Sequence, residues 1–210
     1  MSRTRKEQTP ERSTKRTSPT AGLVEELNRF ADAARRLQGW ELDHSPEPLA
    51  DGPPWNYESM ARGLAAGSGS ILDLGTGGGE VISRVIDGLP CITVATEEWV
   101  VNAPVAAGVW HELRAVFPDM TVFPDHFSAY QDGLREAGLV VEYADEFRRP
   151  VRFRELGHLV YHLVAAPWLI PDFDVESRLH GLQTLQQQLE SGRPLVLTEG
   201  YYVIHARRHA

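Results

Sequence analysis

The chain has 210 residues, of which 42% are hydrophobic and 24% are charged, and it contains a single cysteine. This length favours one domain with tails, and the composition excludes disorder throughout, because enough apolar surface is available to offset the ordering entropy. One cysteine excludes an internal disulfide and a cysteine-rich zinc site. No window has the roughly 20 apolar residues of a membrane helix and no signal core is present, so we expect a soluble, cytoplasmic protein without a membrane partner.

The net charge of −8 is distributed unevenly along the chain. Residues 1–20 carry six basic and two acidic side chains, which gives this segment +4 and leaves −12 on the remainder. The segment mixes Ser, Thr, Pro and charge without apolar periodicity, so we expect a disordered basic tail. A body this acidic argues against a nucleic-acid partner, because phosphate binding depends on clustered Lys and Arg.

Apolar spacing and turn residues predict the order of the helices and strands. Helices are expected at 23–37, 57–66, 81–86, 127–137, 153–166 and 173–190, and more weakly at 100–110. Strands are expected at 70–74, 91–96, 139–144 and 195–205. The segment 41–54, which contains four prolines, is expected to be a linker.

The strand at 70–74, a glycine turn, the helix at 81–86 and the strand at 91–96 fit within about 30 residues, the size of a βαβ unit. Such a unit implies two parallel strands with a right-handed crossover. This is the most specific structural prediction from the sequence.

Glycines at positions 75, 77, 78 and 79 directly follow the first strand of this unit. Without β-carbons, such a loop lets a ligand approach the backbone closely, although a tight structural turn also explains it. Glu80 follows the last glycine, where its carboxylate would repel the diphosphate of a dinucleotide. With Asp73 before the loop, these acids favour a ligand that has a cationic part.

The run Ile71-Leu72-Asp73-Leu74-Gly75-Thr76-Gly77-Gly78-Gly79-Glu80 resembles the first motif of class I S-adenosylmethionine-dependent methyltransferases. The resemblance implies that S-adenosyl-L-methionine is the cofactor and that the loop backbone lies against its methionine and ribose parts. The residues it assigns to the cofactor are Asp73, near the ammonium group, Gly75, Thr76, Gly77 and Gly79 in the loop, and Glu97 at the ribose hydroxyls. Trp99 either covers the adenine or is a packing residue, and Glu98 is the weaker candidate for the ribose.

The sequence at 96–106 and 153–173 is similar to that of a group within this family whose members methylate small molecules. The resemblance covers 55–107, as a cofactor-binding βαβ half, and 111–208, as a C-terminal half, which together form a methyltransferase-like domain at 55–208. Residues 21–54 are then an N-terminal helix and linker.

The resemblance implies an α/β fold, Rossmann-like with three αβα layers and a sheet of seven strands. This chain has no sequence that matches strands 3 to 5 of the family, which predicts a shortened sheet. Unpaired strand edges leave backbone groups unsatisfied. The sheet must therefore close the gap directly, pair with another chain, for example in a homodimer, or remain loose.

His158 and His162 are spaced for one face of a helix, as in a metal-ligand pair, but no Glu accompanies them and we expect no metal site. We expect Tyr161, His162 and Trp168 to line a substrate cavity. The alternative is that these side chains only pack in the core.

Two functions remain open. One is a methyltransferase acting on a small molecule, with no catalytic residue identified; the other is a non-catalytic homologue that binds the cofactor or serves as a binding or oligomerisation protein.

Overall fold

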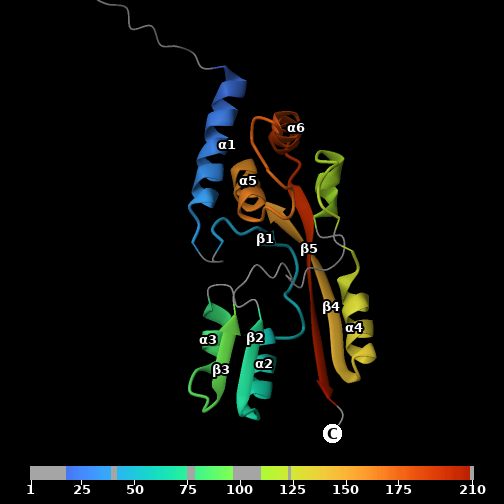
Figure 1. Cartoon of the computed structure of the whole chain (residues 1–210). Helices are drawn as coiled ribbons and strands as arrows, with labels where there is room; N and C mark the ends of the chain where they lie inside the picture. The colour runs from blue at the N-terminus through green and yellow to red at the C-terminus, as the bar shows by residue number, and fades with distance from the viewer. Residues whose placement is uncertain (1–17, 39–41, 75–78, 97–109, 123, 209–210) are drawn as a thin grey trace, which may run out of the picture.

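The structure, a computed structural model, describes residues 18–38, 42–74, 79–96, 110–122 and 124–208 (Figure 1). Its elements, in chain order, are α1 (Pro19–Arg35), β1 (Glu47–Pro48), α2 (Tyr57–Ala66), β2 (Ser70–Leu74), α3 (Glu80–Ile86), β3 (Ile92–Thr96), the 3-10 helix η1 (His111–Ala115), α4 (His126–Glu136), β4 (Leu139–Phe153), α5 (Leu156–Ala165), α6 (Leu179–Glu190) and β5 (Leu195–Arg208). The mixed α/β class is confirmed.

The described strands form two separate sheets. One has the order β1-β4-β5 with antiparallel pairs, and the other is the parallel pair β2-β3, in register from Ser70↔Ile92 to Leu74↔Thr96. The predicted parallel pairing is thus confirmed. The single shortened sheet expected from the resemblance is not what the described residues form, because no strand among them joins β2 to β5.

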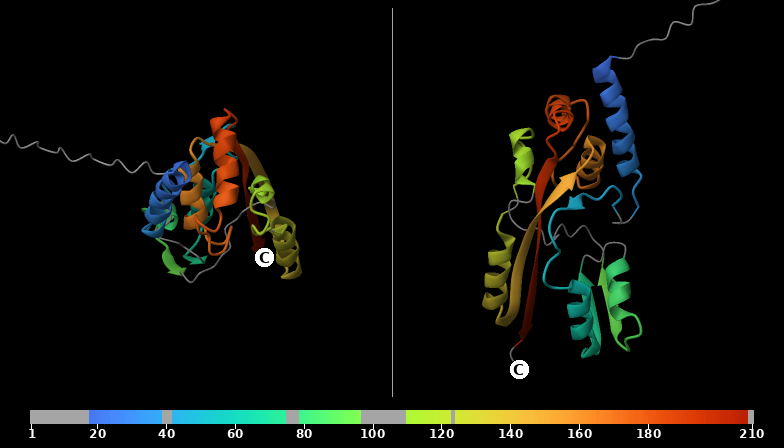
Figure 2. Two further views of the ribbon diagram at one scale, coloured as in Figure 1. Left: turned by 90° about the horizontal axis from the view of Figure 1, so that it is seen from above. Right: turned by 180° about the vertical axis from the view of Figure 1, so that it is seen from behind.

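The main core lies around α1, α5, α6 and the neighbouring ends of β4 and β5, at the top of Figure 1. Leu27 and Ala31 of α1 are buried there together with Leu159 and Leu163 of α5. The first helix is therefore part of the core, although the sequence placed it outside the main domain. The β2-α3-β3 unit lies apart from this core in the right view of Figure 2, and together with α2 it buries mainly Ala65 and Val85.

The strands β4 and β5 are longer than predicted, and β4 takes the residues at which the next helix was expected to begin. Their added length is rich in charge, and Arg149 lies opposite Glu199 in the register and forms an ion pair with it. Cross-strand ion pairs stabilise strands whose sequence has no apolar run.

The last helix, α6, begins at Leu179 rather than at Phe173. Asp172 has a φ of +53°, and the Asp174 carboxylate accepts a hydrogen bond from the Ser177 amide at 2.8 Å. Such local side-chain bonds favour a turn over continued helix.

None of the helices in the described ranges is long and apolar enough to cross a membrane.

Candidate functional site

The candidate site is the carboxyl end of β2, where the glycine motif begins. Asn56 caps α2 by accepting a hydrogen bond from the Ser59 amide at 2.8 Å, and Gly67 ends this helix, so that β2 starts at Ser70. Asp73 is the fourth residue of β2 and lies opposite Ala95 of β3. Its half-buried carboxylate is thereby held one residue before the end of the strand.

Gly79 marks the other end of the glycine motif and is the N-cap of α3, with a φ of +85°. This left-handed conformation is strained for residues that carry a β-carbon, which explains glycine at this position. No atom of the described residues lies within 4 Å of a β-carbon added to Gly79. Among the predicted cofactor residues, Gly75, Thr76, Gly77, Glu97 and Trp99 lie outside the described residues.

Tyr57, at the start of α2, lies close enough to Asp73 to feel its charge. Burial raises the pKa of its hydroxyl, and the negative charge of Asp73 raises it further. The phenol therefore stays protonated at neutral pH, and it remains able to donate a hydrogen bond beside the carboxylate. Sequence reasoning missed this tyrosine, because the pattern around it indicates only that it lies in a helix.

Arg62 ties α2 to the helix that follows the glycine motif. Its guanidinium donates hydrogen bonds to the carbonyl oxygens of Arg84 at 3.2 Å, Val85 at 3.0 Å and Asp87 at 2.7 Å. Glu58 also pairs with the Arg84 side chain, at 2.6 Å. These bonds satisfy carbonyl groups that the end of α3 leaves unpaired, and they hold the two helices together.

A cavity of about 1040 Å³ begins at this unit and reaches β5 and α4. Asp73 and Tyr57 line it on one side, and Tyr130 and Tyr202 line it on the other. The rings of Tyr130 and Tyr202 lie 6.3 Å apart, between centroids. The cavity combines apolar walls with a few polar tips, which is typical of a ligand site.

The residues predicted to line a substrate cavity lie elsewhere, in and beside α5. Tyr161 and His162 are 2% and 5% exposed, and the half-buried Trp168 packs against the main core. None of the three lines the cavity at β2. Their neighbourhood is a cluster of rings around His44, whose carbonyl oxygen lies 3.2 Å from His162 Nε2.

Among the described residues, no group of three or more metal-ligating side chains lies close enough together to hold a metal ion. Burial lowers the pKa of both His158 and His162, which favours neutral imidazoles.

In comparisons with known proteins, no family model matches the chain, and no curated protein matches it significantly.

Proposed function

We propose that this protein binds S-adenosyl-L-methionine at the carboxyl ends of β2 and β3 and transfers its methyl group to a small molecule. The observation that carries the proposal is the parallel β2-α3-β3 unit, in which Asp73 precedes the glycine motif and Gly79, its last glycine, begins α3. This arrangement supports the resemblance to class I methyltransferases, because the family places the cofactor at such a strand-loop-helix junction.

The residues present suit a ligand with a cationic part. Asp73 supplies a half-buried carboxylate that would hold the ammonium group. Gly75, Thr76 and Gly77 would contact the methionine and ribose, Glu97 the ribose hydroxyls and Trp99 the adenine. When bound, the cofactor supplies an activated methyl group on its sulfonium. The protein would contribute mainly orientation and exclusion of water.

A second candidate function, binding without catalysis, is favoured by the separation of the two sheets. In a class I methyltransferase, strands between the first and last strands form one face of the active site. In the described part of this chain, no strand lies in that place, and a cavity separates β2 from β5.

Calorimetry with S-adenosyl-L-methionine and S-adenosylhomocysteine tests the proposal. We expect binding of both, and Asp73→Asn should weaken it about tenfold, as expected for losing a charge-assisted hydrogen bond. The matched control is Asp87→Asn, because Asp87 lies just beyond α3, at the far end of the helix from the glycine motif. Absence of binding at millimolar ligand would exclude both candidates that involve the cofactor. Binding without transfer of a labelled methyl group to a panel of small acceptors would favour the second.

A further inference from the structure

The cavity beside β2 is bounded by the edges of two strands. Four consecutive residues of β2, Ser70 to Asp73, and three consecutive residues of β5, Tyr202 to Ile204, line it. Successive side chains of a strand point to opposite faces, so a cavity that meets every residue in turn lies along the edge. In the described part of the chain, β2 pairs only with β3, and β5 only with β4.

The backbone groups on these two edges face the cavity. The Ile92 amide donates to the Gly69 carbonyl oxygen at 3.2 Å, and this register turns the amide and carbonyl groups of Ser70 and Leu72 away from β3. On β5, the Thr198 carbonyl oxygen is turned away from β4, since it accepts a hydrogen bond from the Trp110 amide at 2.8 Å. Backbone groups alternate between the two edges of a strand, so the amide and carbonyl groups of Tyr202 and Ile204 also point away from β4.

The dimensions and the chemistry of the cavity suit one extended segment of polypeptide. Its volume is about 1040 Å³. A residue in a strand occupies about 4.8 Å between strands, 3.3 Å along the strand and 10 Å between layers, so the cavity has room for roughly six residues. β2 and β5 run in opposite directions (Figures 1 and 2), so an added strand would pair parallel on one side and antiparallel on the other. Asp73 is the one charged side chain among the described residues of the lining, which favours a segment that is apolar and carries a basic residue.

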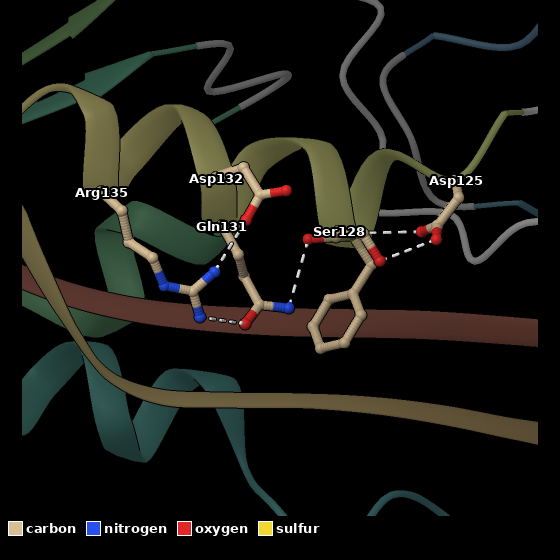
Figure 3. A network of polar contacts seen from close by, with 6 residues as sticks. Asp125, Ser128, Gln131, Asp132 and Arg135 are labelled. Atoms are coloured by element: carbon tan, nitrogen blue, oxygen red, sulfur yellow. Dashed lines mark hydrogen bonds and ion pairs between the residues drawn. The ribbon is translucent and has the colours of Figure 1, made fainter.

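Helix α4 forms one wall of the cavity without having any buried residue. It is held by local polar bonds, shown in Figure 3. The Asp125 carboxylate accepts from the Ser128 amide at 3.1 Å, and Arg135 donates to Asp132 at 2.9 Å. Gly133 of the same helix also lines the cavity, and a β-carbon added to it would meet no atom within 4 Å. The helix is thus formed and capped, with open space on its inner side.

From these observations we propose that the cavity between β2 and β5 binds an extended, apolar segment with a basic residue, supplied by another polypeptide, which adds a strand between the two sheets. The four residues with outward backbone groups, Ser70, Leu72, Tyr202 and Ile204, provide main-chain hydrogen bonds on both sides of the segment. This mode of recognition is strand addition, in which the backbone gives affinity and the pockets between side chains give specificity. The proposal does not depend on cofactor binding, but both ligands would use the carboxylate of Asp73, so the segment and the cofactor would compete for it.

The test is selection of binders from a library of random seven-residue peptides displayed on phage, against the full chain. We expect enrichment of apolar sequences with a Lys or Arg, and at least a tenfold loss of affinity when alternate backbone amides of a selected peptide are N-methylated. Gly133→Leu should also weaken the peptide at least tenfold, because leucine would fill the open space. Gly63→Leu is the matched control, since Gly63 is in α2, has no atom within 4 Å of an added β-carbon and does not line the cavity.

Thermal unfolding of both leucine variants shows that each one folds. Absence of enrichment would overturn the proposal, and so would affinity that N-methylation and Gly133→Leu both leave unchanged. A dimer seen by light scattering and abolished by Gly133→Leu would assign the cavity to a second copy of this chain and overturn the proposal of a foreign segment.

Discussion

The imidazole rings of His44 and His158 are stacked, with centroids 4.5 Å apart and planes inclined by 20°. His44 lies in the segment between α1 and β1, and its backbone has a φ of +58°, whereas His158 belongs to α5. Phe30 of α1 meets both rings edge-on, with centroid distances of 5.3 and 5.7 Å. The stack therefore joins the N-terminal helix and its following segment to the core helix.

Stability should fall as the pH is lowered through the range in which this cluster titrates. Burial lowers the pKa of His158 and His162 below 6.5. The charge of Glu155 partly opposes the shift at His158, and hydrogen bonds to the backbone of His44 and Asp43 partly oppose it at His162. Between that lowered pKa and about 6.5 the unfolded chain binds more protons than the folded chain, so the free energy of unfolding decreases as pH decreases. We expect a lower urea midpoint at about pH 5.5 than at about pH 7.5.

The variant His158→Phe keeps a ring in the stack and removes one titrating group, so its urea midpoint should depend less on pH. His180→Phe, at an exposed position of α6, serves as the control. The carboxylates with lowered pKa values, such as Glu47 and Asp119, lose their stabilising effect only near and below their ordinary values of 4.5 and 3.8. An equal pH dependence in the wild type and His158→Phe would contradict this account.

The contact between α1 and α5 depends on the lack of a side chain at Gly157. A β-carbon there would lie 2.2 Å from Cε2 of the half-buried Phe30, so the Phe30 ring would have to shift. We expect Gly157→Ala to lower the free energy of unfolding by about 1–3 kcal/mol through overpacking. The same substitution at Gly63, which has open space around it, should instead stabilise by about 0.5–1 kcal/mol through helix propensity. Urea denaturation measures the free energy of unfolding of both variants. A stabilised Gly157→Ala would mean that α1 and α5 do not pack this closely.

Arg62 should stabilise the β2-α3-β3 unit locally rather than the whole chain. Arg62→Ala removes three charge-assisted hydrogen bonds to the end of α3, which we expect to cost about 1–2 kcal/mol. Hydrogen exchange should become faster in β2 and β3 but not in α5, because the unit lies outside the main core. Arg29→Ala, in α1, is a control that leaves this unit untouched. Uniformly faster exchange across the chain would show that the unit and the core unfold together.

The parts of the fold that the sequence predicted correctly are those with strong local signals. The bounds of α2 and β2 matched because Asn56 caps the helix, Gly67 ends it and an apolar run follows. The length of β4 was missed because its added residues are charged, and their partners, such as Glu199 for Arg149, are 50 residues away in the chain. Pairing between distant segments leaves no periodic trace in one sequence.

The candidate site shows the same limit. Asp73 and Gly79 were predicted because the resemblance rests on acids and glycines in a fixed local order, and their role in binding stays a prediction. Tyr57 and Tyr202 were not found, because only the tertiary arrangement brings α2 and β5 to the same cavity. The sequence predicted strand edges without partners, but only the structure shows which edges of the described strands have none and what they face.

The β2-β3 sheet has one apolar face that the described residues leave uncovered. Leu72, Ile92 and Val94 are 63%, 72% and 53% exposed, whereas parallel sheets in proteins are normally covered on both faces. If this face is open to water in solution, Val94→Thr should change the free energy of unfolding by less than about 0.5 kcal/mol and should raise solubility. The same substitution at Val85, which is 4% exposed, should cost about 1–3 kcal/mol because it buries a hydroxyl group. Urea denaturation of the two variants compares the sites directly, and a cost at Val94 as large as that at Val85 would show that something covers this face in solution.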